Sequence, residues 1–139
     1  MVCVWSGDAL LHTLKGHTRE VYNVTWVPVA QGVRAHLASS SFDASVRLWD
    51  VERGASVAVL SEHSNPIYSL SFSADGRFLA SGSFDSTVVV WEVESGRPVL
   101  QHSTGSPVYA LGWDSRVGKI AACLMDTTLC VMDVRAALS

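Results

Sequence analysis

Two stretches of the chain repeat one another and decide the fold: Leu37–Asp50, LASSSFDASVRLWD, and Leu79–Glu92, LASGSFDSTVVVWE. Each stretch reads as a short strand, a turn that carries an aspartate, and a second strand that closes on tryptophan. The same spacing continues on both sides, with closing residues at Trp5, Trp49, Trp91 and Met132, at intervals of 44, 42 and 41 residues.

A second series keeps step with the first, because Asp43, Asp85 and Asp126 each stand six residues before a closing position. A period of about 40–45 residues with a closing Trp-Asp is the signature of the WD repeat. Each such unit forms one four-stranded antiparallel blade of a β-propeller, and a closed ring needs about four to eight blades. The chain holds only about three units. It is therefore predicted to be all-β, an incomplete WD-repeat propeller that forms an open arc.

The strand and turn signals divide the chain into one partial propeller with four units. Residues 1–15 end one blade, 16–61 and 62–102 form whole units, and 103–139 form a unit that lacks its outer strand. Unpaired strand edges recruit other strands. We therefore expect self-association through the open blade edges.

Composition narrows the classes of function. The net charge is −3 and the basic residues are scattered singly, which argues against direct nucleic-acid binding. No apolar run reaches the roughly 18 residues that span a membrane. The three cysteines have no zinc spacing and are predicted to be reduced, as in the cytosol or nucleus. His12, His36 and His102 lack partners at ligand spacing, so neither a metal nor a cofactor is expected.

The turn aspartates belong to a polar set that recurs: His17, Ser41, Asp43 and Trp49 return as His63, Ser83, Asp85 and Trp91. Serine, histidine and aspartate could form a catalytic triad, but a catalytic site is rarely duplicated in adjacent repeats and no oxyanion hole is signalled. We therefore predict a structural network, from indole through serine and histidine to aspartate, and no enzyme. Thr104 and Met132 interrupt the set in the fourth unit, which is predicted to be the weakest.

An aromatic series also follows the repeat. Tyrosine recurs early in each unit, and an apolar residue recurs before each turn aspartate: Tyr22, Tyr68 and Tyr109, then Phe42, Phe84 and Met125. Resemblance to WD propellers implies that both positions approach the upper rim of the central channel. They would form an apolar, hydroxyl-bearing ring that binds partner proteins. The alternative is that these six side chains only pack blade against blade.

The segments 37–54 and 66–85 and the ending CVMDVR, residues 130–135, resemble the transducin β-like corepressor proteins. The resemblance implies the last repeats of an eight-bladed nuclear scaffold that links corepressors and a histone deacetylase. The stretch from Pro28 to Ala35 is shorter than that family leads us to expect. The predicted function is thus a non-catalytic interaction scaffold of a nuclear corepressor subunit, with a cytoplasmic pool also allowed. The alternative is a substrate-receptor module of a ubiquitin ligase, or a centriolar or signalling scaffold.

Overall fold

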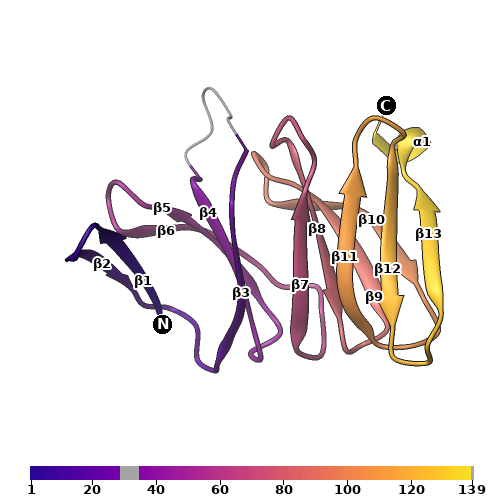
Figure 1. The fold of residues 1–139 in the computed structure, drawn as a ribbon, viewed down its shortest axis with the longest axis horizontal. Coiled ribbons are helices and arrows are strands. Elements are labelled where there is room, and N and C mark those ends of the chain that lie inside the picture. The colour runs from indigo at the N-terminus through magenta and orange to yellow at the C-terminus, as the bar shows by residue number, and fades with distance from the viewer. Residues whose placement is uncertain (29–34, 139) are drawn as a thin grey trace.

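The computed structural model describes residues 1–28 and 35–138, so most of the stretch from Pro28 to Ala35 lies outside the described part. Four antiparallel sheets follow one another along the chain and form an open arc (Figure 1). The first sheet pairs β1 (Val2–Ser6) with β2 (Ala9–Leu14). The second contains β3 (Val21–Trp26), β4 (Leu37–Ser41), β5 (Val46–Asp50) and β6 (Ala55–Leu60).

The third sheet repeats the order of the second, with each strand hydrogen-bonded to the next along the chain. It contains β7 (Ile67–Phe72), β8 (Phe78–Ser83), β9 (Thr87–Glu92) and β10 (Arg97–Ser103). The fourth contains β11 (Val108–Asp114), β12 (Lys119–Leu124) and β13 (Leu129–Asp133), followed by the one-turn helix α1 (Arg135–Leu138). The inner strands β3, β7 and β11 lie side by side across the arc (Figure 1). The predicted all-β, incomplete propeller is confirmed.

The turns between the second and third strands use the same backbone conformation in three sheets. Ala44, Ser86 and Thr127 follow the turn aspartates and have φ of 67°, 67° and 72°. This left-handed region disfavours residues with a side chain. In each case the preceding aspartate accepts the backbone N–H of the residue after the strained position, which holds the turn closed.

The core lies between the sheets and consists of three apolar clusters, one at each junction. Strands β4 and β8 are buried along their whole length, because neighbouring sheets cover both of their faces. Gly82 in β8 shows how closely the sheets approach, since a Cβ there would lie 2.5 Å from Val108 Cγ1.

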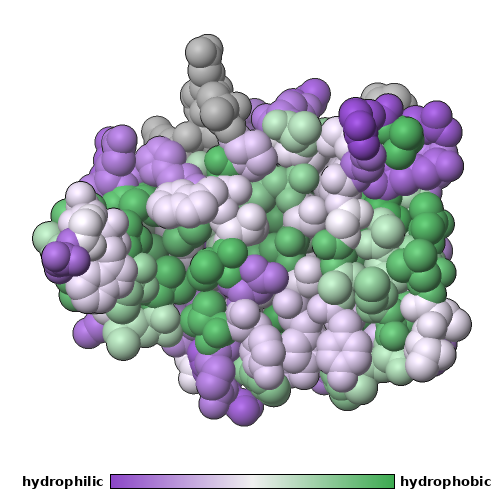
Figure 2. Space-filling model, viewed as in Figure 1, coloured by the Kyte–Doolittle hydropathy of each residue, from purple (hydrophilic) through white to green (hydrophobic). Residues whose placement is uncertain are grey.

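Among the described residues, no further sheet packs against the outward face of the fourth sheet. Leu129 and Val131 are 65% and 58% exposed, whereas the equivalent Val88 and Val90 of the third sheet are buried. Figure 2 shows hydrophobic surface at the right-hand end of the arc, where β13 lies. The sequence anticipates this, because repeats predict apolar residues at the same places whether or not a further sheet covers them.

Candidate functional site

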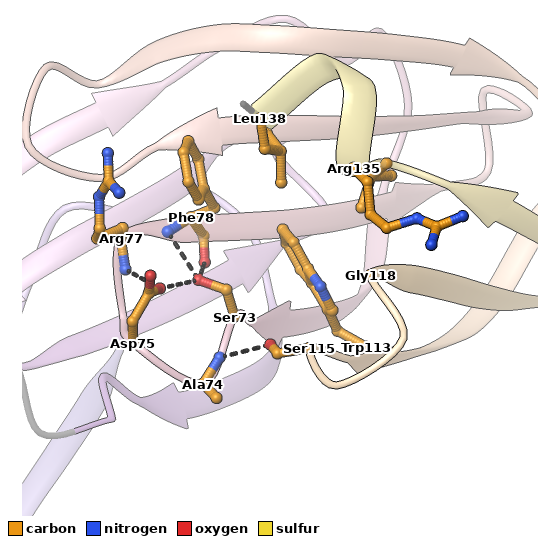
Figure 3. Close-up of a pocket in the computed structure, with 11 residues that line it drawn as sticks. Ser73, Ala74, Asp75, Arg77, Phe78, Trp113, Ser115, Gly118, Arg135 and Leu138 are labelled. Carbon is orange, nitrogen blue, oxygen red and sulfur yellow. Dashed lines mark hydrogen bonds between the residues drawn. The ribbon is translucent and has the colours of Figure 1, made fainter.

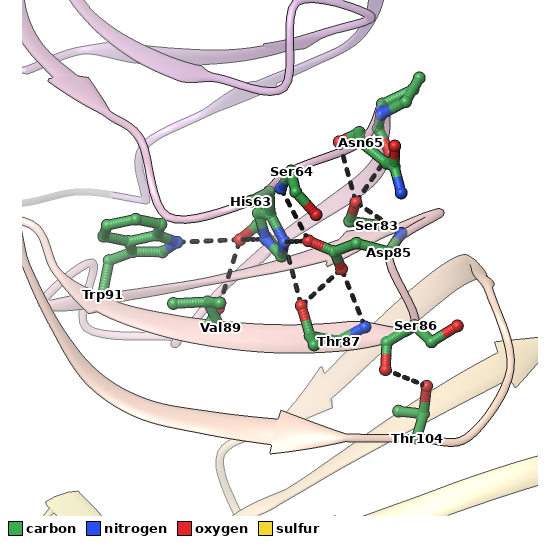
Figure 4. A network of polar contacts seen from close by, with 12 residues as sticks. His63, Ser64, Asn65, Ser83, Asp85, Ser86, Thr87, Val89, Trp91 and Thr104 are labelled. Atoms are coloured by element: carbon green, nitrogen blue, oxygen red, sulfur yellow. Dashed lines mark hydrogen bonds and ion pairs between the residues drawn. The ribbon is translucent and has the colours of Figure 1, made fainter.

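A chain of four side chains ties the third sheet to the segment that precedes it (Figure 4). Trp91 Nε1 donates to Ser81 Oγ over 2.8 Å, and Ser81 Oγ lies 2.7 Å from His63 Nε2. His63 Nδ1 lies 2.9 Å from Asp85 Oδ2. Because Trp91, Ser81 and His63 are buried, each of these polar atoms depends on its neighbour rather than on water.

One arrangement of protons gives every polar atom of this four-residue network a hydrogen-bond partner. The indole N–H donates to the Ser81 hydroxyl, the hydroxyl donates to His63 Nε2, and His63 Nδ1–H donates to the Asp85 carboxylate. This requires a neutral imidazole, and burial lowers the pKa of His63 despite the opposing effect of Asp85. Burial alone would raise the pKa of Asp85, but hydrogen bonds from Thr87, Ser64 and His63 outweigh it and lower that pKa.

The second sheet contains the same network. Trp49 Nε1 donates to Ser39 Oγ over 2.8 Å, which lies 2.7 Å from His17 Nε2, and His17 Nδ1 lies 2.8 Å from Asp43 Oδ2. Burial raises the pKa of Asp43, but hydrogen bonds from Ser45 and His17 lower it to about 2. The histidines, aspartates and tryptophans that the sequence picks out therefore do meet.

The predicted serines of the network are wrong by two residues, because Ser39 and Ser81 fill the positions given to Ser41 and Ser83. Side chains two apart on a strand share a face, so both serines of a pair point the same way. Only the earlier one reaches the indole. Ser41 Oγ instead donates to the Arg19 carbonyl over 3.2 Å and accepts the Asp43 N–H. Ser83 does the same with the carbonyls of Asn65 and Pro66 and the N–H of Asp85.

These networks have the wrong geometry for the triad alternative. Ser41 Oγ makes no hydrogen bond to His17, so the three candidate residues do not form a relay. The serines that do contact the histidines, Ser39 and Ser81, are fully buried and cannot meet a substrate. A nucleophile must be reachable by the reacting carbonyl. The networks are built to fix the sheets in place.

The aromatic series forms a continuous row across the three inner strands. Tyr68 stands at its centre, with its ring centroid 6.1 Å from that of Phe42, 6.2 Å from Phe84 and 5.9 Å from Tyr109. Tyr22 contacts both Phe42 and Tyr68, at 5.0 and 4.8 Å. Tilted and edge-on contacts of this kind stabilise an aromatic cluster beyond its buried area.

The row packs together and still faces solvent. Tyr22 and Tyr109 are 52% and 51% exposed, and Phe84 and Met125 are 41% and 42% exposed. Met125 takes the same backbone position as the two phenylalanines, since its N–H donates to Pro107 O as that of Phe84 donates to Pro66 O. The five aromatic residues and Met125 thus present an apolar surface at one rim of the arc.

Two further side chains contact this row. Neither recurs in the other units, and neither was predicted from the sequence. The Arg19 guanidinium lies over the Phe42 ring, 5.5 Å from its centroid. Asn23 Nδ2 donates to the Tyr68 backbone carbonyl over 3.4 Å and links β3 to β7. No single-residue pattern in the sequence marks either of them. The contact of Asn23 crosses between two units, and Arg19 lies before the first strand of its own unit, where the repeat sets no residue type. Within residues 1–28 and 35–138, no helix is long and apolar enough to cross a membrane.

Comparison with known proteins agrees with this geometry. The family described as WD domain, G-beta repeat matches residues 8–50 and 54–92. The F-box-like/WD repeat-containing protein TBL1X of Mus musculus is 50% identical over 99 residues, 71% of this chain and 19% of the relative. The WD40 repeat-containing protein HOS15 of Arabidopsis thaliana is 48% identical over 99 residues, 71% of this chain and 16% of the relative. Coronin-7 of Mus musculus is 44% identical over 66 residues, 48% of this chain and 7% of the relative. The chain thus spans less than a fifth of the length of these relatives.

Proposed function

The chain belongs to the WD domain, G-beta repeat family, and we propose that it is a non-catalytic scaffold that binds peptide segments of partner proteins on its aromatic row. The observation that carries this proposal is the exposure of a continuous aromatic cluster whose members sit on three separate sheets. A core cluster would be covered, whereas a partly exposed cluster of tyrosine and phenylalanine has the composition of interface hot spots.

Hydrogen bonds within the chain order the backbone that carries the row, without any partner bound. The buried networks fix the turns that carry Phe42 and Phe84, because Asp43 and Asp85 each accept bonds from the turn and from the preceding segment. A surface that is already ordered loses less conformational entropy on binding. This supports a docking platform rather than a segment that folds on contact.

We base the proposed partners on resemblance. We place the chain in a nuclear transcriptional corepressor subunit, with a corepressor and a histone deacetylase complex as partners. The supporting observation is the 50% identity to the TBL1X relative across 71% of this chain. The name of that relative also contains "F-box-like". This name favours, as a second candidate, a substrate-receptor module of a ubiquitin ligase.

The test replaces the central ring of the row. Tyr68→Ala removes a ring that contacts four others, and the loss of an interface anchor costs about 2 kcal/mol, or roughly 30-fold in affinity. Binding is measured by fluorescence polarisation with overlapping peptides that cover the corepressor. Tyr68→Phe keeps the ring and serves as the matched variant. Val57→Ala, on the exposed outer strand β6, controls for unspecific loss.

Affinity that is equal for Tyr68→Ala and the parent, with both proteins folded, would return the row to a packing role. Binding of peptides from ubiquitin-ligase substrates in place of corepressor peptides would favour the second candidate. Trp113 lies on β11, four residues after Tyr109. Peptide binding that survives Tyr68→Ala but is lost in Trp113→Ala would place the site at that end of the inner strands.

A further inference from the structure

One ring of the aromatic row already holds a cation that the chain itself supplies. The Arg19 guanidinium lies over Phe42, 5.5 Å from the ring centroid, and Arg19 Nε lies 3.5 Å from a carboxylate oxygen of Glu20. The face of an aromatic ring carries partial negative charge and attracts a guanidinium placed over it. The second unit therefore shows how this rim of the arc accommodates an arginine side chain.

The equivalent ring of the third unit, Phe84, takes the same backbone position. Phe84 N–H donates to the carbonyl of Pro66, and Phe42 N–H donates to the carbonyl of Glu20, over 2.9 Å in each case. Among the described residues, no cation lies over Phe84. Phe84 is 41% exposed, whereas Phe42 is half-buried. The ring without an arginine is thus the more open of the two.

Asn65 is the residue of the third unit that corresponds to Arg19. The Ser83 hydroxyl donates to the Asn65 carbonyl (Figure 4), as the Ser41 hydroxyl donates to the Arg19 carbonyl. The backbone of residue 65 is therefore fixed beside its turn in the same way as that of residue 19. Asparagine has no charge and a shorter side chain, so it leaves the place of the guanidinium to another molecule.

Acidic side chains outnumber basic ones around the row. His63 is neutral and does not compensate the charge of Asp85 beside it. Asp126 is exposed and forms no ion pair within the described part of the chain. The segments before the inner strands and the turns after β4, β8 and β12 contain five carboxylates and two cations, namely Glu20, Asp43, Glu62, Asp85 and Asp126 against Lys15 and Arg19.

From this complementarity we infer that Phe84 binds an arginine side chain of a basic peptide segment in a partner protein. The guanidinium lies over the Phe84 ring as that of Arg19 lies over Phe42, and the carboxylates of the rim attract the peptide. The inference rests on the proposed function, because the same peptide lies on the aromatic row. It adds the chemistry that the peptide must carry.

Three fluorescein-labelled nonapeptides in a glycine-serine background serve as probes in fluorescence polarisation. Each has two leucines, and the residue between them is arginine, citrulline or glutamate. Citrulline has nearly the shape of arginine without the charge, so the comparison isolates the cation. The arginine probe should bind at least about threefold tighter than the citrulline probe. Its affinity should fall as salt is added, and the glutamate probe should bind most weakly.

Two variants test whether the ring of Phe84 gives this preference for arginine over citrulline. Phe84→Leu keeps an apolar side chain but removes the ring, so the two probes should bind about equally. Phe42→Leu is the matched control, because Arg19 already occupies that ring in the parent. The preference should persist in Phe42→Leu.

A second pair of variants supplies the missing cation from within the chain. Asn65→Arg places an arginine at the counterpart of Arg19, where it should cover Phe84 and abolish the preference. Ser64→Arg adds the same charge one residue earlier, at the counterpart of Thr18, and should keep most of the preference. Both positions are exposed, so neither variant disturbs the core.

Four results would overturn the inference. The first is equal affinity of the parent for the arginine and citrulline probes. The second is a preference that survives in Phe84→Leu and in Asn65→Arg, because the charge of the rim alone would then explain it. The third is an equal loss in Ser64→Arg and Asn65→Arg. The fourth is light scattering that shows an oligomer of the parent and a monomer of Phe84→Leu, which would give the ring to a second copy of the chain.

Tyr68→Ala separates failure of this inference from failure of the proposed function. If the parent shows no preference but Tyr68→Ala loses both the arginine and the citrulline probe, the row remains the docking site and only the arginine is wrong. If Tyr68→Ala binds both probes as the parent does, the proposed function fails and the inference fails with it.

Discussion

Replacement of Asp85 by alanine tests whether the buried network holds the third sheet together. The Asp85 carboxylate accepts four hydrogen bonds, from His63 Nδ1 at 2.9 Å, from the N–H groups of Ser64 and Thr87 at 3.0 Å each, and from Thr87 Oγ1 at 2.5 Å. Asp126 occupies the same turn position in the fourth sheet. Among the described residues its carboxylate accepts only from the N–H and hydroxyl of Thr128, and both of these bonds are exposed to solvent. It provides the matched control.

The magnitude follows from what each donor does after the carboxylate is gone. Water can reach Ser64 and the Thr87 turn, so those bonds cost about 0.5 kcal/mol each. The His63 side chain has no exposed surface, so its Nδ1–H would be left unpaired at a cost of about 1–3 kcal/mol. Asp85→Ala should therefore lower the free energy of unfolding by about 3 kcal/mol, and Asp126→Ala by about 1 kcal/mol or less.

In Asp85→Ala, His63 has an alternative hydrogen-bond partner, and a second variant removes that partner. Thr87 Oγ1 lies 3.1 Å from His63 Nδ1. The imidazole could therefore shift its proton to Nε2 and accept the Thr87 hydroxyl at Nδ1. In Asp85→Ala/Thr87→Val this partner is missing, so the double variant should lose about 1 kcal/mol more than the sum of the two singles.

Urea denaturation followed by circular dichroism measures these differences as shifts of the midpoint at constant slope. Equal midpoint shifts for Asp85→Ala and Asp126→Ala would refute the reasoning, because they would mean that the buried histidine does not need its carboxylate. Additive singles in the double variant would show that the tautomer shift does not occur.

Four further outcomes are expected. Gly82→Ala should lower the melting temperature by several degrees, since the new Cβ meets Val108 and forces the third and fourth sheets apart; an unchanged melting temperature would contradict this packing. Ala44→Gly should raise the free energy of unfolding by about 0.5–1 kcal/mol, because glycine tolerates the φ of 67°, and a loss of stability would count against strain at this turn. Burial lowers the pKa of His63 in the folded chain, so the unfolded chain binds the proton first and stability should fall as pH drops below about 6.5; His63→Gln should lack this step in a series of melting curves. Light scattering over a concentration series should show self-association of the parent, and a stable monomer of 15.0 kDa would contradict it.

The repeat makes most of the fold predictable from sequence. Period, turn residues and alternation indicate the strands of the second and third sheets, and the equivalence of units brings His63, Asp85 and Trp91 to one place. The division of the chain at residues 15, 61 and 102 remains a prediction. The choice between Ser81 and Ser83 was not predictable, because both alternate to the same face and only the reach of the indole distinguishes them.

The hollow lined by Phe78, Trp113 and Leu138, between the turns that follow β7 and β11 (Figure 3), could not be predicted from the sequence for a different reason. Its two turns are 41 residues apart and meet through a single side-chain bond, from Ala74 N–H to Ser115 Oγ. Neither turn matches a binding motif by itself. Contacts between successive units depend on how far the sheets rotate past one another, and no pattern within one unit encodes that rotation.

The fourth sheet shows how a repeat loses a polar network without leaving a buried group unpaired. Methionine stands at the tryptophan position as Met132, threonine at the histidine position as Thr104, and Ala122 takes the place of Ser81. Thr104 Oγ1 contacts the carbonyl oxygens of Ser86 and Ser106, while Met132 and Ala122 are buried among apolar neighbours. Loss of one partner alone would strand a donor or an acceptor, whereas replacement of all of them by apolar groups can be nearly neutral.

The predicted weakness of this sheet therefore needs another source. Its network is replaced and not simply broken, so the polar residues do not account for the predicted low stability. Leu129 and Val131 remain exposed, although their equivalents in the third sheet are covered by a neighbour. Covering such side chains contributes about 1.5–3 kcal/mol each. The stability of the fourth sheet is thus set by whatever packs against this face, and a partner that covers it should stabilise the sheet more than restoration of the histidine would.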